Sequence, residues 1–119
     1  MATFSRHILS GSTNGRGIPV LGATTSGGQL IHTAYTATGS AGDEIWLYAV
    51  QYGTTTGVTL TLRHGGATSA DQIAITMAPG AGAVPLCPGF MLNGALESRA
   101  FASASNEISI HGWVNRVAS

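Results

Sequence analysis

Lysine is absent from this sequence of 119 residues, and charged residues of all kinds make up only 8% of it. The cations are five arginines spread along the chain and balanced by five acidic residues: Arg6, Arg16, Arg63, Arg99 and Arg116. Without a basic cluster, the chain lacks the electrostatic footprint of a nucleic-acid-binding protein or of a segment attracted to anionic lipids. A charge-poor surface is instead prone to associate with other proteins.

Disulfides and long apolar runs are missing as well. The single cysteine, Cys87, excludes an internal disulfide, and its apolar surroundings predict a buried, unreactive thiol. The longest apolar stretch, residues 77–92, is interrupted by three prolines and cannot form a membrane-spanning helix. The first ten residues lack the apolar segment of a secretory signal, which predicts a protein made in a cytoplasm.

Strong helix formers are also scarce. Half of the chain consists of small residues, with 17 Gly, 17 Ala, 14 Thr and 11 Ser. Glycine and threonine lower helix propensity, whereas threonine and valine suit the half-buried surface of a β-sheet and glycine suits its turns. The composition therefore predicts an all-β protein.

Apolar segments recur at roughly ten-residue spacing and are separated by Gly-rich turns. This pattern predicts a single antiparallel β-sandwich or barrel, jelly-roll-like, with an extended N-terminal arm. Residues 44–51 are apolar on both faces, which predicts a central strand covered on both sides, and residues 53–57 have the length of a hairpin connection. The expected strands are 3–9, 29–35, 44–51, 58–63, 72–77, 84–86, 90–92, 96–102 and 107–117.

The chain is expected to form one domain, with an N-terminal strand and extended arm over residues 1–28 and the sandwich over residues 29–119. The arm, residues 10–28, is rich in Gly, Ser and Thr, and such a long irregular segment is unusual inside a compact domain. It could become ordered on a partner by adding a strand to an exposed sheet edge. The alternative is a flexible loop with no binding role.

The motifs of catalysis are missing. The four histidines have no metal-ligand spacing, which predicts no metal site and no cofactor. Residues 11–17 are Gly-rich but lack the lysine of a phosphate-binding loop. Asp43 and Glu44 are adjacent at the start of the expected strand 44–51. Neighbouring side chains of a strand point to opposite faces, so these two carboxylates cannot act together as acid and base. A role in the turn is expected for Asp43, and we expect no catalytic residues and no enzymatic activity.

The aromatic residues suggest an interface. Trp113 shares its expected outward face with His111 and Asn115, and an outward tryptophan beside Arg116 is a plausible anchor for a partner protein. A sugar-binding platform of aromatic side chains is the alternative, although small cores usually bury such residues. The residues expected at a protein interface are Arg16, Ile18, Pro19, Val20, Trp113 and Arg116.

Several motifs along the chain resemble those of small virion structural proteins of tailed phages. They span nearly the whole sequence and are framework motifs rather than catalytic signatures. They are Gly-Arg-Gly-Ile-Pro-Val (15–20), Leu-Ile-His-Thr-Ala (30–34), Asp-Glu-Ile-Trp-Leu-Tyr-Ala (43–49), Leu-Asn-Gly (92–94), Arg-Ala-Phe-Ala (99–102) and Gly-Trp-Val-Asn-Arg-Val (112–117).

This resemblance implies a capsid decoration, or cement, protein with a β-sandwich or barrel fold and no catalytic residues. Such a protein binds the outer capsid shell of the virion, after synthesis in the host cytoplasm, and bridges subunits of the major capsid protein. The resemblance also implies a homo-oligomer, with a trimer favoured and a dimer possible, and no nucleic-acid or membrane partner. The alternatives are a glycan-binding head spike or tail adhesin, or a structural protein of the tail or connector.

Overall fold

The structure, a computed structural model, describes residues 3–22 and 28–118. These residues form nine β-strands and one short 3-10 turn, η2 (Ser69–Asp71), and they contain no α-helix. The all-β prediction is therefore confirmed. The strands are β1 (Thr3–Ile8), β2 (Ile18–Pro19), β3 (Gln29–Thr33), β4 (Gly42–Gln51), β5 (Val58–His64), β6 (Gln72–Met77), β7 (Ala83–Leu92), β8 (Glu97–Ala102) and β9 (Ile108–Ala118).

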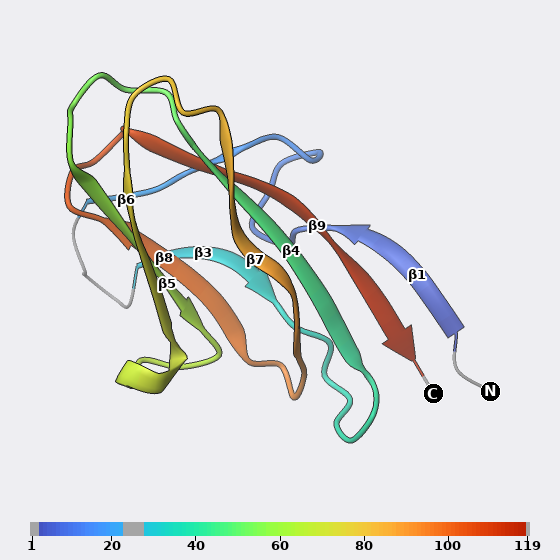
Figure 1. The fold of residues 1–119 in the computed structure, drawn as a ribbon. Helices are drawn as coiled ribbons and strands as arrows, with labels where there is room; N and C mark the ends of the chain where they lie inside the picture. Colours follow the sequence, from blue (N-terminus) through green and yellow to red (C-terminus); the bar gives the residue numbers. More distant parts are fainter. Residues whose placement is uncertain (1–2, 23–27, 119) are drawn as a thin grey trace.

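The strands form two antiparallel sheets that pack against each other as a sandwich (Figure 1). Sheet A has the order β1-β9-β4-β7, with β2 also paired to β9, and sheet B has the order β3-β8-β5-β6. Among the eight longer strands the pairing is nested: β1 pairs with β9, β3 with β8, β4 with β7 and β5 with β6. This connectivity is that of a jelly roll.

Alternating apolar residues build the core between the two sheets. Successive side chains of a strand point to opposite faces, so every second residue of β4 is buried, including Ile45, Leu47 and Ala49. Leu60 and Leu62 of β5 meet them from sheet B and are fully buried.

Strand β4 is central in sheet A, but only one of its faces is covered. Trp46, Tyr48 and Val50 are half-buried and lie on the outer face of the sheet, so the prediction of two covered faces was wrong. The connection over residues 52–57 was also misassigned. It links β4 of sheet A to β5 of sheet B rather than closing a hairpin, because each strand finds its partners elsewhere in the sequence.

The proline-rich stretch forms one ten-residue strand, β7, and not the two short strands that were predicted. Pro85 and Pro88 are tolerated because β7 lies at the edge of sheet A and pairs only with β4 among the described strands. The register with β4 shifts twice, between Ile45 and Trp46 and between Leu47 and Tyr48. These irregularities let the strand pass both prolines without ending.

The described part of the predicted arm, residues 10–22, lies against the sandwich. The Gly11 amide donates to the Ile31 carbonyl at 2.9 Å, and the Val20 amide donates to the Ile108 carbonyl at 2.9 Å. Ile18 pairs with Ile110 of β9, and the side chains of Ile18 and Val20 belong to the core. Residues 23–27 of the predicted arm lie outside the described residues.

Candidate functional site

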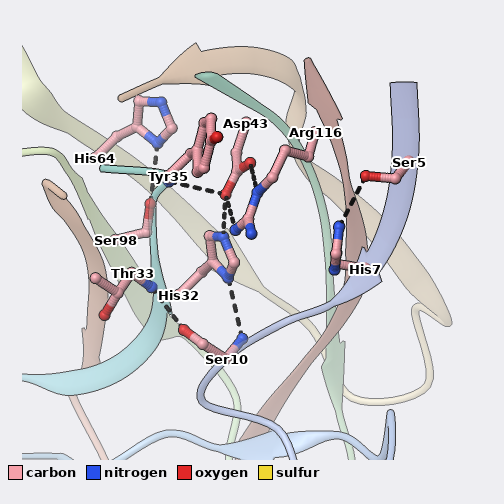
Figure 2. A network of polar contacts seen from close by, with 10 residues as sticks. All are labelled: Ser5, His7, Ser10, His32, Thr33, Tyr35, Asp43, His64, Ser98 and Arg116. Carbon is pink, nitrogen blue, oxygen red and sulfur yellow. Dashed lines mark hydrogen bonds and ion pairs between the residues drawn. The ribbon is translucent and has the colours of Figure 1, made fainter. Parts of the chain in front are cut away.

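An extended network of polar contacts surrounds Asp43, whose side chain is fully buried (Figure 2). Arg116 of β9 donates to both carboxylate oxygens, with Nε–Oδ1 at 2.8 Å and Nη2–Oδ2 at 3.0 Å. Oδ2 also accepts from the Tyr35 amide at 3.1 Å and from His32 Nε2 at 2.7 Å. The guanidinium of Arg116 lies over the Tyr35 ring, 4.8 Å from its centroid. The carboxylate is thereby satisfied on both oxygens.

His32 extends this cluster to the N-terminal segment. Its Nδ1 accepts a hydrogen bond from the Ser10 amide at 3.0 Å, so Nε2 carries the ring proton that is donated to Asp43. The Ser10 hydroxyl in turn accepts from the Thr33 amide at 2.7 Å. The cluster therefore ties residue 10 to strands β3, β4 and β9.

Burial by itself would raise the pKa of Asp43, but the hydrogen bonds from Arg116 and His32 outweigh it and lower that pKa below its ordinary value. Asp43 therefore stays ionised as a buried counter-ion. His32 resembles the base of a catalytic triad because Asp43 binds one of its ring nitrogens, but the other nitrogen is held by a backbone amide and not by a hydroxyl nucleophile. The arrangement is suited to cross-linking strands.

Other histidine–serine pairs occur as well, and one of them joins Ser5 Oγ to His7 Nε2 at 2.9 Å within β1 (Figure 2). Ser98 Oγ lies 3.2 Å from His64 Nδ1 (Figure 2), and Ser109 Oγ lies 3.2 Å from His111 Nε2. Burial lowers the pKa of His64. No group of three or more His, Cys, Asp or Glu side chains able to hold a metal ion occurs among the described residues.

A row of stacked side chains crosses the outer face of sheet A. Trp46 of β4 and Trp113 of β9 are direct cross-strand partners, with ring centroids 5.9 Å apart and planes inclined by 11°. The Tyr48 ring stacks on Trp113 with centroids 6.0 Å apart, and Arg6 of β1 lies 5.9 Å from the centre of the same ring. Trp113 is thus contacted from the β4 side and from the β1 side. Stacked cross-strand aromatic pairs of this kind stabilise the sheet.

Strand β1 is the most exposed part of the described chain that belongs to a sheet. It lies at the end of sheet A, beyond the area that sheet B covers (Figure 1), and all six of its residues are exposed. Phe4 is 74% exposed and Ile8 54%. Phe4, Arg6 and Ile8 pair with outward-facing residues of β9, so they continue the outer face of sheet A. The surface formed by β1 and the aromatic row is called the β1 surface below.

The structure separates the residues that the sequence placed together at an interface. Ile18 and Val20 are buried core residues, so a partner cannot reach their side chains while this fold persists. Arg116 is committed to Asp43, with 26% of its side chain exposed. These three assignments followed from treating residues 10–28 as free and Arg116 as unpaired.

The other three predicted interface residues remain at the surface. Arg16 and Pro19 are exposed, and Trp113 is half-buried within the stacked row. Only Trp113 is part of the β1 surface.

Sequence reasoning did not single out Phe4, Arg6 or Ile8. A short strand was predicted over residues 3–9, and this was the available signal. What it could not reveal is that sheet B leaves this strand uncovered. The Asp43 cluster was missed as well, and its predicted turn role was wrong, because Asp43 lies inside β4 with its side chain in the core.

Comparison with known proteins gives no matching family model, no matching curated protein and no matching solved structure. Among the described residues there is also no helix long and apolar enough to cross a membrane.

Proposed function

We propose that this protein is a non-enzymatic capsid decoration protein, which binds the outer shell of a phage head and bridges neighbouring subunits of the major capsid protein. The observation that carries the proposal is the β1 surface. A six-residue strand that exposes Phe4 and Ile8, and that has β9 as its only partner among the described strands, leaves a row of backbone donors and acceptors open to pairing.

An exposed edge strand with apolar side chains is a hazard unless a partner covers it. The outer face beside β1 adds the aromatic row, so a partner that pairs with β1 also gains apolar contact area. We propose that an extended segment of the capsid protein adds a strand to β1, with main-chain hydrogen bonds supplying affinity and Phe4 and Ile8 supplying selectivity.

Two further considerations support a virion role. The sequence motifs resemble those of phage structural proteins over most of the chain, and the jelly roll is an architecture that viral capsid domains use. The second is an analogy at the level of the fold, and it weighs less than the surface itself. Copies bound on a regular capsid lattice would gain avidity from one another, and the resemblance favours trimers over dimers.

A glycan-binding adhesin is the second candidate, because lectins also use the jelly roll and aromatic side chains commonly hold sugars. The stacking argues against it at this surface. Trp113 has Trp46 on its β4 side and Arg6 on its β1 side, so the ring that would hold a sugar is already covered.

Electron cryo-microscopy of virions carrying this protein tests the proposal. We expect density at regular positions on the outer capsid, with β1 facing a capsid protein segment. Replacing Phe4 and Ile8 together by serine should reduce occupancy strongly, whereas the matched pair Leu21→Ser and Tyr52→Ser, at other exposed apolar positions, should leave it unchanged. Density confined to a tail, spike tip or connector would overturn the decoration role.

A further inference from the structure

Two arginines face each other on the outer side of sheet B. Arg63 of β5 and Arg99 of β8 are direct cross-strand partners, on neighbouring strands (Figure 1). Like charges placed opposite each other destabilise a sheet unless something neutralises them. Both arginines line a cavity of about 390 Å³. Its other lining residues are Gly65, Gly66, Ala67, Ala95, Leu96 and Glu97.

Arg99 already has its counter-ion. Its Nε donates to Glu97 Oε1 at 2.9 Å, and its Nη1 donates to the Gly28 carbonyl at 3.0 Å. Glu97 therefore neutralises Arg99 and fixes the direction of its guanidinium.

Arg63 has no such partner among the described residues. Its guanidinium carbon lies 4.9 Å from the centre of the Phe101 ring, and no described carboxylate forms an ion pair with it. Its Nε is buried and makes no hydrogen bond. A buried donor on a charged group is costly to leave unsatisfied, and a planar guanidinium matches a carboxylate with two parallel hydrogen bonds.

We propose that the cavity between Arg63 and Arg99 binds one carboxylate, supplied by an acidic side chain of the partner protein. Among the residues that line the cavity, two arginines and one glutamate leave a single net positive charge, which a carboxylate balances and a doubly charged phosphate exceeds. Ala95 and Leu96 offer apolar contact to the methylene groups of a glutamate. The naming of a protein partner rests on the proposed function, whereas the site itself rests on the cavity.

Nuclear magnetic resonance titration of the ¹⁵N-labelled protein tests the site directly, with N-acetyl-glutamate N-methylamide as the probe. We expect a saturable shift of the Arg63 Nε–H signal and of the Gly66 amide. The isosteric N-acetyl-glutamine N-methylamide should cause none, because it lacks the charge. Equal shifts with both probes, no saturation with the glutamate probe, or tighter binding of inorganic phosphate would overturn the proposal.

Two variants sharpen this test. Arg63→Gln should abolish the shift of the Gly66 amide, whereas Arg16→Gln, the same substitution at an exposed arginine elsewhere, should preserve it. Glu97→Gln should tighten probe binding several-fold, because it removes the carboxylate that competes inside the cavity. Unchanged or weaker binding by Glu97→Gln would contradict the charge argument.

Virion occupancy separates this inference from the proposed function. Reduced occupancy of Arg63→Gln relative to the wild-type protein supports a carboxylate contact with the capsid, and equal occupancy would overturn the contact. If the wild-type protein is absent from the capsid surface while the glutamate probe still binds, the proposed function fails and the carboxylate site stands.

Discussion

Asp43 shows how a single carboxylate can be buried completely and remain ionised. Burying a lone charge costs several kcal/mol, but four hydrogen bonds from Arg116, His32 and the Tyr35 amide compensate for the lost water. Because these bonds lower the pKa of Asp43 below its ordinary value of 3.8, the stabilisation is present above that pH. It is lost as the pH falls through the lowered value.

Replacing Asp43 by asparagine tests this role. The variant removes the counter-ion of Arg116 and turns an acceptor oxygen into a donor that faces other donors. We expect the free energy of unfolding to fall by about 3 kcal/mol, measured by urea denaturation at neutral pH. Glu97→Gln, which breaks an exposed ion pair, should cost less than about 1 kcal/mol. Similar losses for the two variants would contradict a special role of the buried pair.

His64 gives the molecule a second pH response, at higher pH. Burial lowers its pKa below the ordinary value of 6.5, so the unfolded chain takes up a proton before the folded one. The free energy of unfolding should therefore fall as the pH drops from above 6.5 toward the lowered value.

Urea denaturation at about pH 7.5 and about pH 5.5 measures this change. His64→Gln should make the decrease smaller, whereas His7→Gln, at an exposed position of β1, should leave it in place. An identical decrease in wild type and His64→Gln would exclude His64 as its source.

At the scale of elements, alternation predicted the strands well and their surroundings poorly. The buried residues of β4 and β5 follow from period-two patterns that need no knowledge of the fold. Whether the other face of β4 is covered depends on which strands and loops lie above it. The residue pattern of β4 does not contain this information. β7 was predicted as two pieces because prolines normally interrupt a sheet, and only its edge position explains the continuity.

In the N-terminal segment, a loss of partner binding is easily confused with a loss of folding. Deletion of residues 2–20 would remove Leu9, Ile18 and Val20 from the core, so it tests folding rather than binding.

A sharper test of this segment compares two adjacent residues of β2. Ile18→Ala should lower the free energy of unfolding by about 3 kcal/mol, since Ile18 is buried, and Pro19→Ala should change it by no more than about 0.5 kcal/mol. Chemical denaturation of both variants measures the difference. A small effect of Ile18→Ala would mean that the segment detaches readily and can serve as an arm.

At the scale of the whole molecule, the nested pairing could not be predicted in detail. The first strand pairs with the last, so β1 contacts residues more than a hundred positions away, and no local pattern specifies such a partner. The Asp43 cluster has the same origin, because His32, Asp43 and Arg116 meet only after β3, β4 and β9 are in place. Strand spacing and turn composition were sufficient to predict the sandwich architecture. The Asp43 cluster could not be predicted in this way, because it depends on which strands become neighbours.

The overall charge balance leads to the last prediction. Five arginines and five acidic residues leave no net charge, so long-range attraction should contribute little to the proposed binding to a capsid. Binding through the β1 surface should depend instead on apolar contact and main-chain hydrogen bonds, which salt screens weakly.

Co-sedimentation of the purified protein with virions that lack it measures this dependence. We expect the affinity of the protein for these virions to change less than about tenfold between about 0.1 M and about 1 M NaCl. Phe4→Ser with Ile8→Ser should weaken it by at least about tenfold at either salt concentration. A steep loss of binding with salt in the wild-type protein would place the dominant contacts on charged residues and away from β1.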